Sequence, residues 1–363
     1  MSPRLRARAL PTCIVAAALA VAGSSLGATG AGAARKTTPT PQLGFNSYVQ
    51  DDCQSNATWA SDAQGQFTAL KALGANSIAL AFPIYMASIN SSSLFTRRTC
   101  GTNYQTPSAA RLAVAIKEAH ALHLRVFLRP LLNESMLQSK GAWRGTIHPK
   151  NVGQWFKSYL SVLTPYLRLA QQQKVEYFAI STELDSLSKK SNWASLISAA
   201  KKIYKGSLTF TVTWTFGSTG KVAHAGTSPG MDTYQAVSLP NNATPTELLN
   251  GWNNAVASSN KVPWSLSSAT IDEVAILAQD GAYSQPYAWS LPSVTYPFDQ
   301  NIQASWYSMV CSFFKMHSMR GIYFWGIWYD DGASALPSTP SPGLAQKIQP
   351  ASAAVIKSCY TGK

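Results

Sequence analysis

Eight short apolar runs, most of them followed by a stretch with helical spacing of apolar residues, constrain the fold of this chain most. Continuous β-branched and aromatic runs are typical of strands that are buried on both faces of a parallel sheet. Alternating strands and helices favour a parallel sheet, and eight such units favour closure over an open sheet. We therefore expect an α/β fold, a single (β/α)8 TIM barrel. The runs are Leu43–Tyr48, Ser77–Phe82, Arg125–Arg129, Glu176–Ser181, Leu208–Trp214, Asp232–Val237, Ser268–Val274 and Gly321–Ile327.

Helices are expected between these runs wherever apolar residues recur at helical spacing. Phe67, Leu70 and Leu73 share one face of the first helix, and Gly74 is its expected stop. The others are expected at Thr106–Leu122, with Thr106 and Pro107 as cap and first residue, and at Asn151–Gln173, Asn192–Tyr204, Thr244–Ser258, Asp299–His317 and near Leu344–Ile356. Phe216–Gly230 has the weakest helical pattern. No Gly-x-Gly-x-x-Gly follows the first run, which argues against a dinucleotide-binding fold.

The N-terminus has the layout of a secretory signal peptide. Arg4, Arg6 and Arg8 precede an apolar stretch, and small residues then lead to an expected cleavage site near Ala33. We expect residues 1–33 to be the signal peptide, 34–41 an exposed leader and 42–363 the catalytic barrel. The apolar stretch is too short to be a good membrane span, so we predict a secreted protein that has no membrane contact after cleavage.

The charge of the chain is strongly positive but scattered. The formal net charge is +14, and removal of the three signal-peptide arginines leaves 27 basic against 16 acidic residues, or +11. The basic residues form only pairs, such as Arg97-Arg98 and Lys189-Lys190, and no nucleic-acid-binding motif accompanies them. We therefore expect adhesion to anionic surfaces, and no nucleic acid as a partner.

Four cysteines follow the signal peptide, which in an oxidising compartment suggests two disulfides. Cys53 and Cys100 follow the first two strands and would lie on adjacent loops. Cys311 and Cys359 would join the last two helices, which are neighbours in a closed barrel. We predict the pairs Cys53–Cys100 and Cys311–Cys359. The wide spacings, without Cys-x-x-Cys, argue against the alternative of a zinc site.

Glu183 and Glu273 each lie at the end of an apolar run, the fourth and the seventh. Parallel barrels place their active sites at the carboxyl ends of the strands. Two glutamates at such ends suggest a glycosidase that uses one carboxyl as acid and the other as nucleophile. The alternative is that the two glutamates cap helices or pair with arginine.

Aromatic and polar residues accumulate at the same strand ends. Sugar rings present C–H patches that pack on aromatic faces, and their hydroxyls bind Asn, Arg, Tyr and carboxylates. The predicted substrate-binding residues are Asn46, Arg129, Trp143, Trp214, Tyr234 and Trp325. We also expect Tyr234, on the neighbouring strand, to donate a hydrogen bond to Glu273.

With these residues in place, the chain resembles glycoside hydrolase family 113 from about Gly44 to Gly332. The collinear matching segments are Leu73–Asn76, Ala115–His120, Trp143–Gly145, Trp155–Tyr159, Ser181–Leu184, Asp232–Tyr234, Glu247–Trp252, Asp272–Val274 and Gly321–Trp325. The resemblance implies a (β/α)8 enzyme of the endo-β-1,4-mannanase type. It also implies a retaining mechanism with Glu183 as acid/base and Glu273 as nucleophile, which needs no metal or organic cofactor.

The chain departs from the family pattern at three places. Leu131 follows Arg129-Pro130 where a histidine is usual, Ser181 replaces a glycine, and Ala275-Ile276 stand where Gly-Tyr is usual. Two hypotheses therefore stay open. The first is a secreted, monomeric, retaining β-glycoside hydrolase of mannan or a related polysaccharide or oligosaccharide, or of a different β-glycan. The second is a glycan-binding barrel that has lost catalysis.

Overall fold

The computed structural model describes residues 40–100, 105–137, 141–213, 224–258 and 265–362. Pro39–Lys363 forms one compact unit. The expected signal peptide and most of the expected leader lie outside the described residues. None of the helices in the described ranges is long and apolar enough to cross a membrane.

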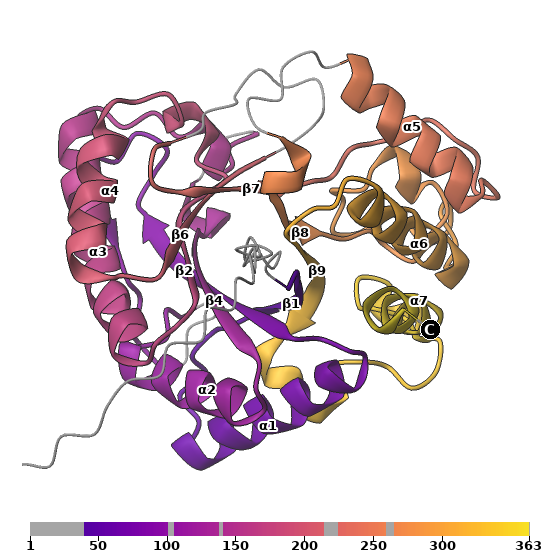
Figure 1. The fold of residues 1–363 in the computed structure, drawn as a ribbon, viewed down its shortest axis with the longest axis horizontal. Coiled ribbons are helices and arrows are strands. Elements are labelled where there is room, and N and C mark those ends of the chain that lie inside the picture. The colour runs from indigo at the N-terminus through magenta and orange to yellow at the C-terminus, as the bar shows by residue number, and fades with distance from the viewer. Residues whose placement is uncertain (1–39, 101–104, 138–140, 214–223, 259–264, 363) are drawn as a thin grey trace, which may run out of the picture. The chain divides into compact units, whose positions relative to one another are not determined.

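Eight parallel strands close into a barrel, as expected (Figure 1). β1 pairs with both β2 and β9, which closes the ring, and a short strand β3 (Leu94–Phe95) lies antiparallel to the end of β2. The barrel strands are β1 (Gln42–Tyr48), β2 (Ser77–Met86), β4 (Arg125–Leu132), β5 (Tyr177–Thr182), β6 (Ser207–Thr213), β7 (Ser228–Asp232), β8 (Thr270–Val274) and β9 (Gly321–Trp328).

Helices surround the barrel (Figure 1). They are α1 (Asn56–Ala72), α2 (Ala109–Ala121), α3 (Val152–Gln172), α4 (Asn192–Ile203), α5 (Pro245–Ser258), α6 (Gln300–Met316) and α7 (Pro350–Thr361). Asn151 and Asp299 cap α3 and α6 with their side chains, at the expected starts of these helices. Most of the weak pattern at Phe216–Gly230 lies outside the described residues.

Several elements have bounds that differ from the expected ones: β2 and β4 continue to Met86 and Leu132, and three further elements begin elsewhere. The sixth barrel strand is Ser228–Asp232 and not Asp232–Val237, because Pro229 and Gly230 pair with β6 although they look like turn residues. The helix α2 starts at Ala109, since the Ser108 hydroxyl accepts from Arg111 N (3.1 Å) and caps it. The last helix begins at Pro350, a residue favoured at the first helical position.

The barrel interior is built in layers whose composition changes along the axis. Ala79, Phe127, Ala179 and Tyr323 form one apolar layer. Two residues beyond Phe127 on β4, Arg129 belongs to a polar layer, because side chains on one face of a strand recur every second residue. Tyr48, Ala81, Leu131 and Trp325 form a second apolar cluster toward the carboxyl ends.

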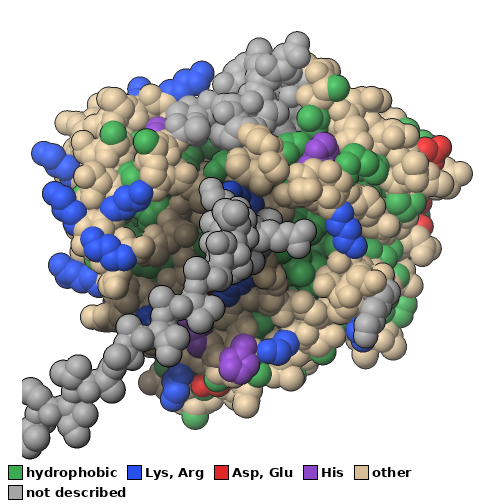
Figure 2. All heavy atoms as spheres, in the orientation of Figure 1, with side chains coloured by type: hydrophobic (Ala, Val, Ile, Leu, Met, Phe, Trp, Pro, Cys, Tyr) green, Lys and Arg blue, Asp and Glu red, His purple; other side chains and the backbone are tan. Residues whose placement is uncertain are grey.

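The two predicted disulfides are confirmed. Cys53 bonds Cys100 with Cα atoms 5.8 Å apart, and Cys311 bonds Cys359 with Cα atoms 5.9 Å apart. The second bond joins α6 to α7, which are packed neighbours. In Figure 2, Lys and Arg side chains stand as separate spots, several along the edge where α3 and α4 lie.

Candidate active site

Glu183 is held in a strained conformation directly beyond β5. Its φ is 53°, in the left-handed region that costs a non-glycine residue about 1 kcal/mol or more. The backbone is fixed there because Glu183 N–H donates to Thr211 O on β6 (3.1 Å). Such strain is concentrated at functional sites. It turns the carboxyl group of Glu183 into the mouth of the barrel, where its side chain is only 7% exposed.

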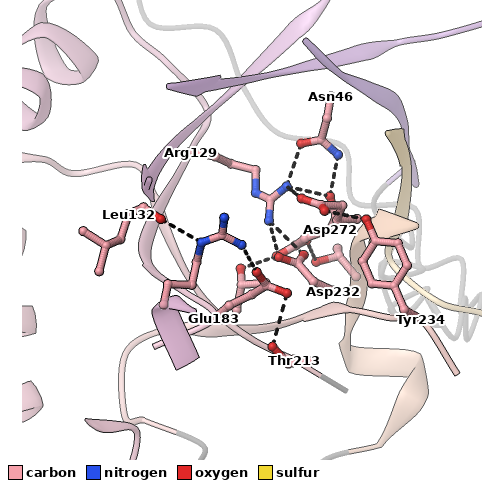
Figure 3. A network of polar contacts seen from close by, with 12 residues as sticks. Asn46, Arg129, Leu132, Glu183, Thr213, Asp232, Tyr234 and Asp272 are labelled. Atoms are coloured by element: carbon pink, nitrogen blue, oxygen red, sulfur yellow. Dashed lines mark hydrogen bonds and ion pairs between the residues drawn. The ribbon is translucent and has the colours of Figure 1, made fainter. Parts of the chain in front are cut away.

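Both carboxyl oxygens of Glu183 have partners. Thr213 Oγ1 donates to Oε1 (3.2 Å), and the Arg144 guanidinium contacts Oε2. Arg144 is itself fixed, since its Nε donates to Leu132 O (2.8 Å) and its Nη2 lies 3.2 Å from Glu134 Oε1. Figure 3 shows this part of the network. The arginine therefore holds Glu183 in one orientation.

Glu273 faces the same region because the strand that carries it is irregular. The pairing of β8 with β7 shifts between Met231 and Asp232, and its pairing with β9 shifts between Ile271 and Val274. Side chains alternate in a regular strand, so Asp272 and Glu273 would point to opposite faces. Irregularities of this kind redirect side chains near active sites. Here Arg129 donates to the Glu273 carboxylate and to the backbone carbonyl of Asp272, while the Asp272 carboxyl accepts from Thr211.

Both oxygens of Glu273 are held as well, by partners that differ from those of Glu183. Tyr234 OH donates to Oε1 (2.5 Å), and Arg129 Nη1 donates to Oε2 (3.1 Å). Burial raises the pKa of Glu273, and the Glu183 charge adds to this, while Arg129 and the Tyr234 hydrogen bond oppose it. Burial also raises the pKa of Tyr234 well above its ordinary value, so its hydroxyl remains a donor.

Arg129 is the hub of a fully buried polar layer beneath Glu273 (Figure 3). Its Nη2 donates to both oxygens of Asp232 (2.8 and 2.7 Å), and its Nη1 donates to Asn46 Oδ1 (2.7 Å). Asn46 Nδ2 donates in turn to Asp272 O (2.8 Å). The arrangement fixes the arginine from several sides, so it can hold Glu273 with little freedom.

Asp272 is a second buried carboxyl inside the barrel. Hydroxyls of Thr211 (2.5 Å) and Thr270 contact its two oxygens. Burial raises its pKa to about 6, against the lowering effects of Arg129 and the two hydroxyls. The single positive charge of Arg129 thus lies among several buried carboxyl groups, and it cannot neutralise the negative charge of all of them.

A cleft of about 530 Å³ opens above the two glutamates. Its lining includes Glu183, Glu273, Tyr234, Trp143 and Trp325, all predicted from the sequence as site residues. Arg144, Thr213 and Trp289 line it too and were not predicted, and Trp328, at the end of β9, lines it beside Trp325.

Asn46 and Arg129 are placed differently from the prediction. Both are fully buried below Glu273 and do not line the cleft. β4 continues to Leu132 instead of ending at Arg129, and β1 ends at Tyr48 as expected, two residues beyond Asn46, so both residues lie inside the barrel. Trp214 lies outside the described residues.

The aromatic wall of the cleft is supported from below. Trp325 packs on Tyr48 with ring centroids 5.7 Å apart, and Leu131 belongs to the same cluster. Leu131, in place of the usual histidine, thus supports the tryptophan with apolar contact. No described group accepts a hydrogen bond from Trp325 Nε1. On the other side, Gly145 allows the Trp143 ring to lie against it, since a Cβ there would be 2.2 Å from the ring.

Nothing in the described residues forms a metal site of three or more His, Cys, Asp or Glu side chains. His120, on α2, lies 3.3 Å from a Glu176 carboxylate oxygen. Glu183 and Glu273, held by Arg, Tyr and Thr side chains, give the cleft two carboxyl groups for acid–base and nucleophilic chemistry.

Comparisons with known structures identify the same architecture. A GH113 β-1,4-mannanase solved as a complex aligns with a TM-score of 0.68 and 17% identity, covering 89% of this chain and 100% of that one. The GH113 β-mannanase AaManA from Alicyclobacillus acidocaldarius aligns with a TM-score of 0.65 and 19% identity, covering 89% and 98%. A β-D-glucuronidase from Dictyoglomus thermophilum aligns at 0.50 and 13%, covering 90% and 51%. At these identities the likeness shows the fold.

The sequence itself provides the assignment to a family. No curated protein sequence matches the chain. The family model described as Glycoside Hydrolase Family 113 matches residues 52–334, a range that contains both glutamates and all the strands from β2 to β9. The chain therefore belongs to glycoside hydrolase family 113.

Proposed function

We propose that this glycoside hydrolase is a secreted, retaining β-glycosidase in which Glu183 is the acid/base and Glu273 the nucleophile. The observation that carries the proposal is the pair of glutamates in one cleft, each with both oxygens held by a different set of partners. Their unequal surroundings fit unequal roles, as double displacement requires.

The first step would transfer a proton from Glu183 to the leaving glycosidic oxygen while Glu273 attacks the anomeric carbon. Arg144 would stabilise the carboxylate that Glu183 becomes when it gives up this proton. In the second step Glu183 would take a proton from water, and the hydroxide would release the sugar from Glu273.

The supports of Glu273 suit a nucleophile. Tyr234 and Arg129 each bind one oxygen, so the carboxylate is oriented and its charge is stabilised in a site that excludes much of the solvent. Asn46 and Asp232 act at one remove, because they fix Arg129 and do not reach the cleft.

The stereochemistry of the product tests the mechanism. Wild-type enzyme should release a sugar with the anomeric configuration of its substrate, which proton NMR can detect before mutarotation. A product of inverted configuration would instead require a single displacement and would remove the nucleophile role of Glu273.

Substitutions separate the two roles. Glu183→Ala should still react with an activated aryl glycoside, since a good leaving group needs no proton. Azide should then trap its intermediate as a glycosyl azide of retained configuration. Glu273→Ala cannot form that intermediate, so azide should attack directly and give the inverted product. The opposite pattern would exchange the two assignments.

We propose β-1,4-mannan as the substrate, which the names of the aligned GH113 enzymes support. Release of reducing sugar should be compared on mannan, glucomannan, cellulose, xylan and chitin fragments. Hydrolysis of another β-glycan in preference to mannan would correct the substrate and keep the mechanism. Binding without any hydrolysis would favour the second candidate, a glycan-binding barrel, for which the apolar Leu131 is the supporting observation.

Secretion belongs to the same proposal. Two disulfides persist best in an oxidising compartment, and the N-terminal sequence has the pattern of a signal peptide. N-terminal sequencing of protein from the culture medium should find a start near Ala33. Recovery of the full chain from the cytoplasm alone would contradict this.

A further inference from the structure

Two exposed aromatic side chains stand on the rim of the cleft. Tyr287 is 66% exposed and Trp289 is 65% exposed, and both line the cleft. The Trp289 ring lies 6.3 Å from that of Trp325, at an interplanar angle of 78°. Among the described residues they are the two most exposed aromatic side chains in the molecule. Because most of their surface is exposed, these two side chains contribute little to the stability of the fold.

The segment that carries the two rings is well fixed. It belongs to the connection of residues 275–299 between β8 and α6. Gln279 precedes the two rings, and its Nε2 donates to Leu291 O (3.2 Å) and to Tyr296 O (3.0 Å), which both follow them in the chain. Backbone bonds add to this, from Ala278 N to Ala345 O (2.9 Å) and from Asp280 N to Pro297 O (3.0 Å). The loop that carries the two rings is therefore held in place by hydrogen bonds.

The base of this connection is buried, in contrast to its rim. Leu277, Ala278, Ala282 and Tyr283 are buried in the protein, so they account for the folding of the loop. The exposed rings lie between this base and the solvent, on the β8 side of the cleft, where Ala275 and Ile276 continue the apolar wall from Glu273. An apolar surface thus runs from the candidate nucleophile to the rim.

We propose that Tyr287 and Trp289 form a second sugar-binding subsite, which stacks a ring of a glycan chain that extends from the catalytic pair past Trp325. The inference rests on the proposed function, because it takes the cleft to bind a chain of pyranose units. Aromatic faces at a cleft rim match the C–H patches of such rings. The subsite makes the enzyme favour long chains over short ones.

The dependence of kcat/KM on chain length tests this. With β-1,4-linked manno-oligosaccharides of two to six units, wild-type kcat/KM should rise with length. Trp289→Ala should lose about tenfold on the hexasaccharide, a change of the size that one aromatic contact provides, and less on the disaccharide. Trp289→Phe, which keeps a ring, should recover much of the loss.

Val294 offers a matched control, because it lies in the same connection, is 98% exposed and does not line the cleft. Val294→Ala should show the wild-type dependence on length. If Trp289→Ala and Val294→Ala have the same length dependence while the wild type hydrolyses the series, the subsite is overturned and the proposed function stands.

A binding experiment separates the subsite from catalysis. In a Glu273→Ala background, quenching of tryptophan fluorescence by β-1,4-mannohexaose and by cellohexaose should give an affinity that falls about tenfold on adding Trp289→Ala. If the wild type hydrolyses no glycan but this difference persists, the subsite stands and the enzyme proposal fails. Equal affinities of Glu273→Ala with and without Trp289→Ala would overturn the subsite. It would also be overturned if the protein is a dimer and Trp289→Ala dissociates it without any change in sugar binding.

Discussion

At the scale of single residues, the two glutamates differ in what fixes them. Glu183 is positioned by a strained backbone and a partly exposed arginine, and Glu273 by a strand irregularity and a buried arginine. Charged groups that are desolvated and held by charge-assisted hydrogen bonds are well oriented. Substitutions of the residues around the two carboxyls should therefore change kcat and its pH dependence in different ways.

Tyr234→Phe removes the hydroxyl that donates to Glu273 and leaves the ring. We expect kcat to fall by roughly tenfold or more, since a hydrogen bond to a charged group contributes about 1.5–3 kcal/mol. This bond also opposes the rise in the pKa of Glu273. Its loss should move the acidic limb of the kcat/KM profile to higher pH, because the nucleophile must be ionised. Steady-state kinetics between about pH 3 and pH 8 measure both effects.

Tyr159→Phe is the control for that experiment. Tyr159 is buried, whereas Tyr234 is half-buried at the cleft, and the Tyr159 hydroxyl donates to Ile180 O (3.1 Å) away from the cleft. Its loss should lower stability and leave the acidic limb in place. An unshifted limb in Tyr234→Phe would contradict the role of this hydrogen bond.

The raised pKa of Asp272 predicts that the stability of the protein depends on pH. Burial raises its pKa from 3.8 to about 6, so the folded protein holds this proton more tightly than the unfolded chain. The contribution is fully present below pH 3.8 and is lost as pH rises through about 6. A shift of this size corresponds to about 3 kcal/mol. The free energy of unfolding of wild type relative to Asp272→Asn should therefore fall by this order between about pH 4 and pH 7, measured by denaturant titration. A difference that is constant with pH would refute the assignment.

At the scale of elements, the register of β7 depends on a glycine. A Cβ on Gly230 would lie 1.9 Å from Asp272 Oδ2 and 2.9 Å from Thr209 Cγ2. The strand can pair closely with β6 and β8 only because this position has no side chain. The same absence leaves room for the Asp272 carboxyl inside the barrel.

Gly230→Ala should therefore displace Asp272 and lower the free energy of unfolding by about 1–3 kcal/mol, the usual cost of overpacking. Activity should fall as well, because Asp272 precedes Glu273 on β8. The matched control is Gly343→Ala, where nothing lies within 4 Å of the added Cβ. Thermal melts and kinetics of the two variants measure the contrast, and equal behaviour would mean that the strand adapts without strain.

The elements also explain which parts of the site the sequence could predict. Glu183 and Glu273 end clear apolar runs, so the parallel-strand rule located them. The depth of Arg129 could not be predicted, since the run of apolar residues stops at it while the strand continues through Pro130 to Leu132. Arg144 belongs to the matching segment Trp143–Gly145, but it lies in a short 3-10 helix between the strands, and its contact with Glu183 is visible only in the folded chain.

At the scale of the whole molecule, the barrel is closed by contacts between distant parts of the sequence. β1 pairs with β9, and Tyr360 of α7 donates to Gly44 O (2.6 Å) in the first strand. Folding must therefore bring the two ends of the barrel together, at a cost in chain entropy. Each disulfide reduces this cost, because it closes a loop in the unfolded chain and so lowers the conformational entropy of the unfolded state.

The two disulfides should stabilise the barrel separately. Their sequence separations are 47 and 48 residues, so the chain-entropy model gives each about 4 kcal/mol. For a barrel of this size the loss of one bond should lower Tm by roughly 10 °C.

The double variant Cys311→Ala, Cys359→Ala should lose more stability than Cys53→Ser, Cys100→Ser. The reason is that Cys311 and Cys359 are buried between α6 and α7, so their loss leaves a cavity. Calorimetry of both double variants measures the order, and kcat/KM should stay near the wild-type value because none of the four cysteines lines the cleft. A Tm equal to that of the wild type in either variant would show that the bond constrains a loop that the unfolded chain keeps closed without it.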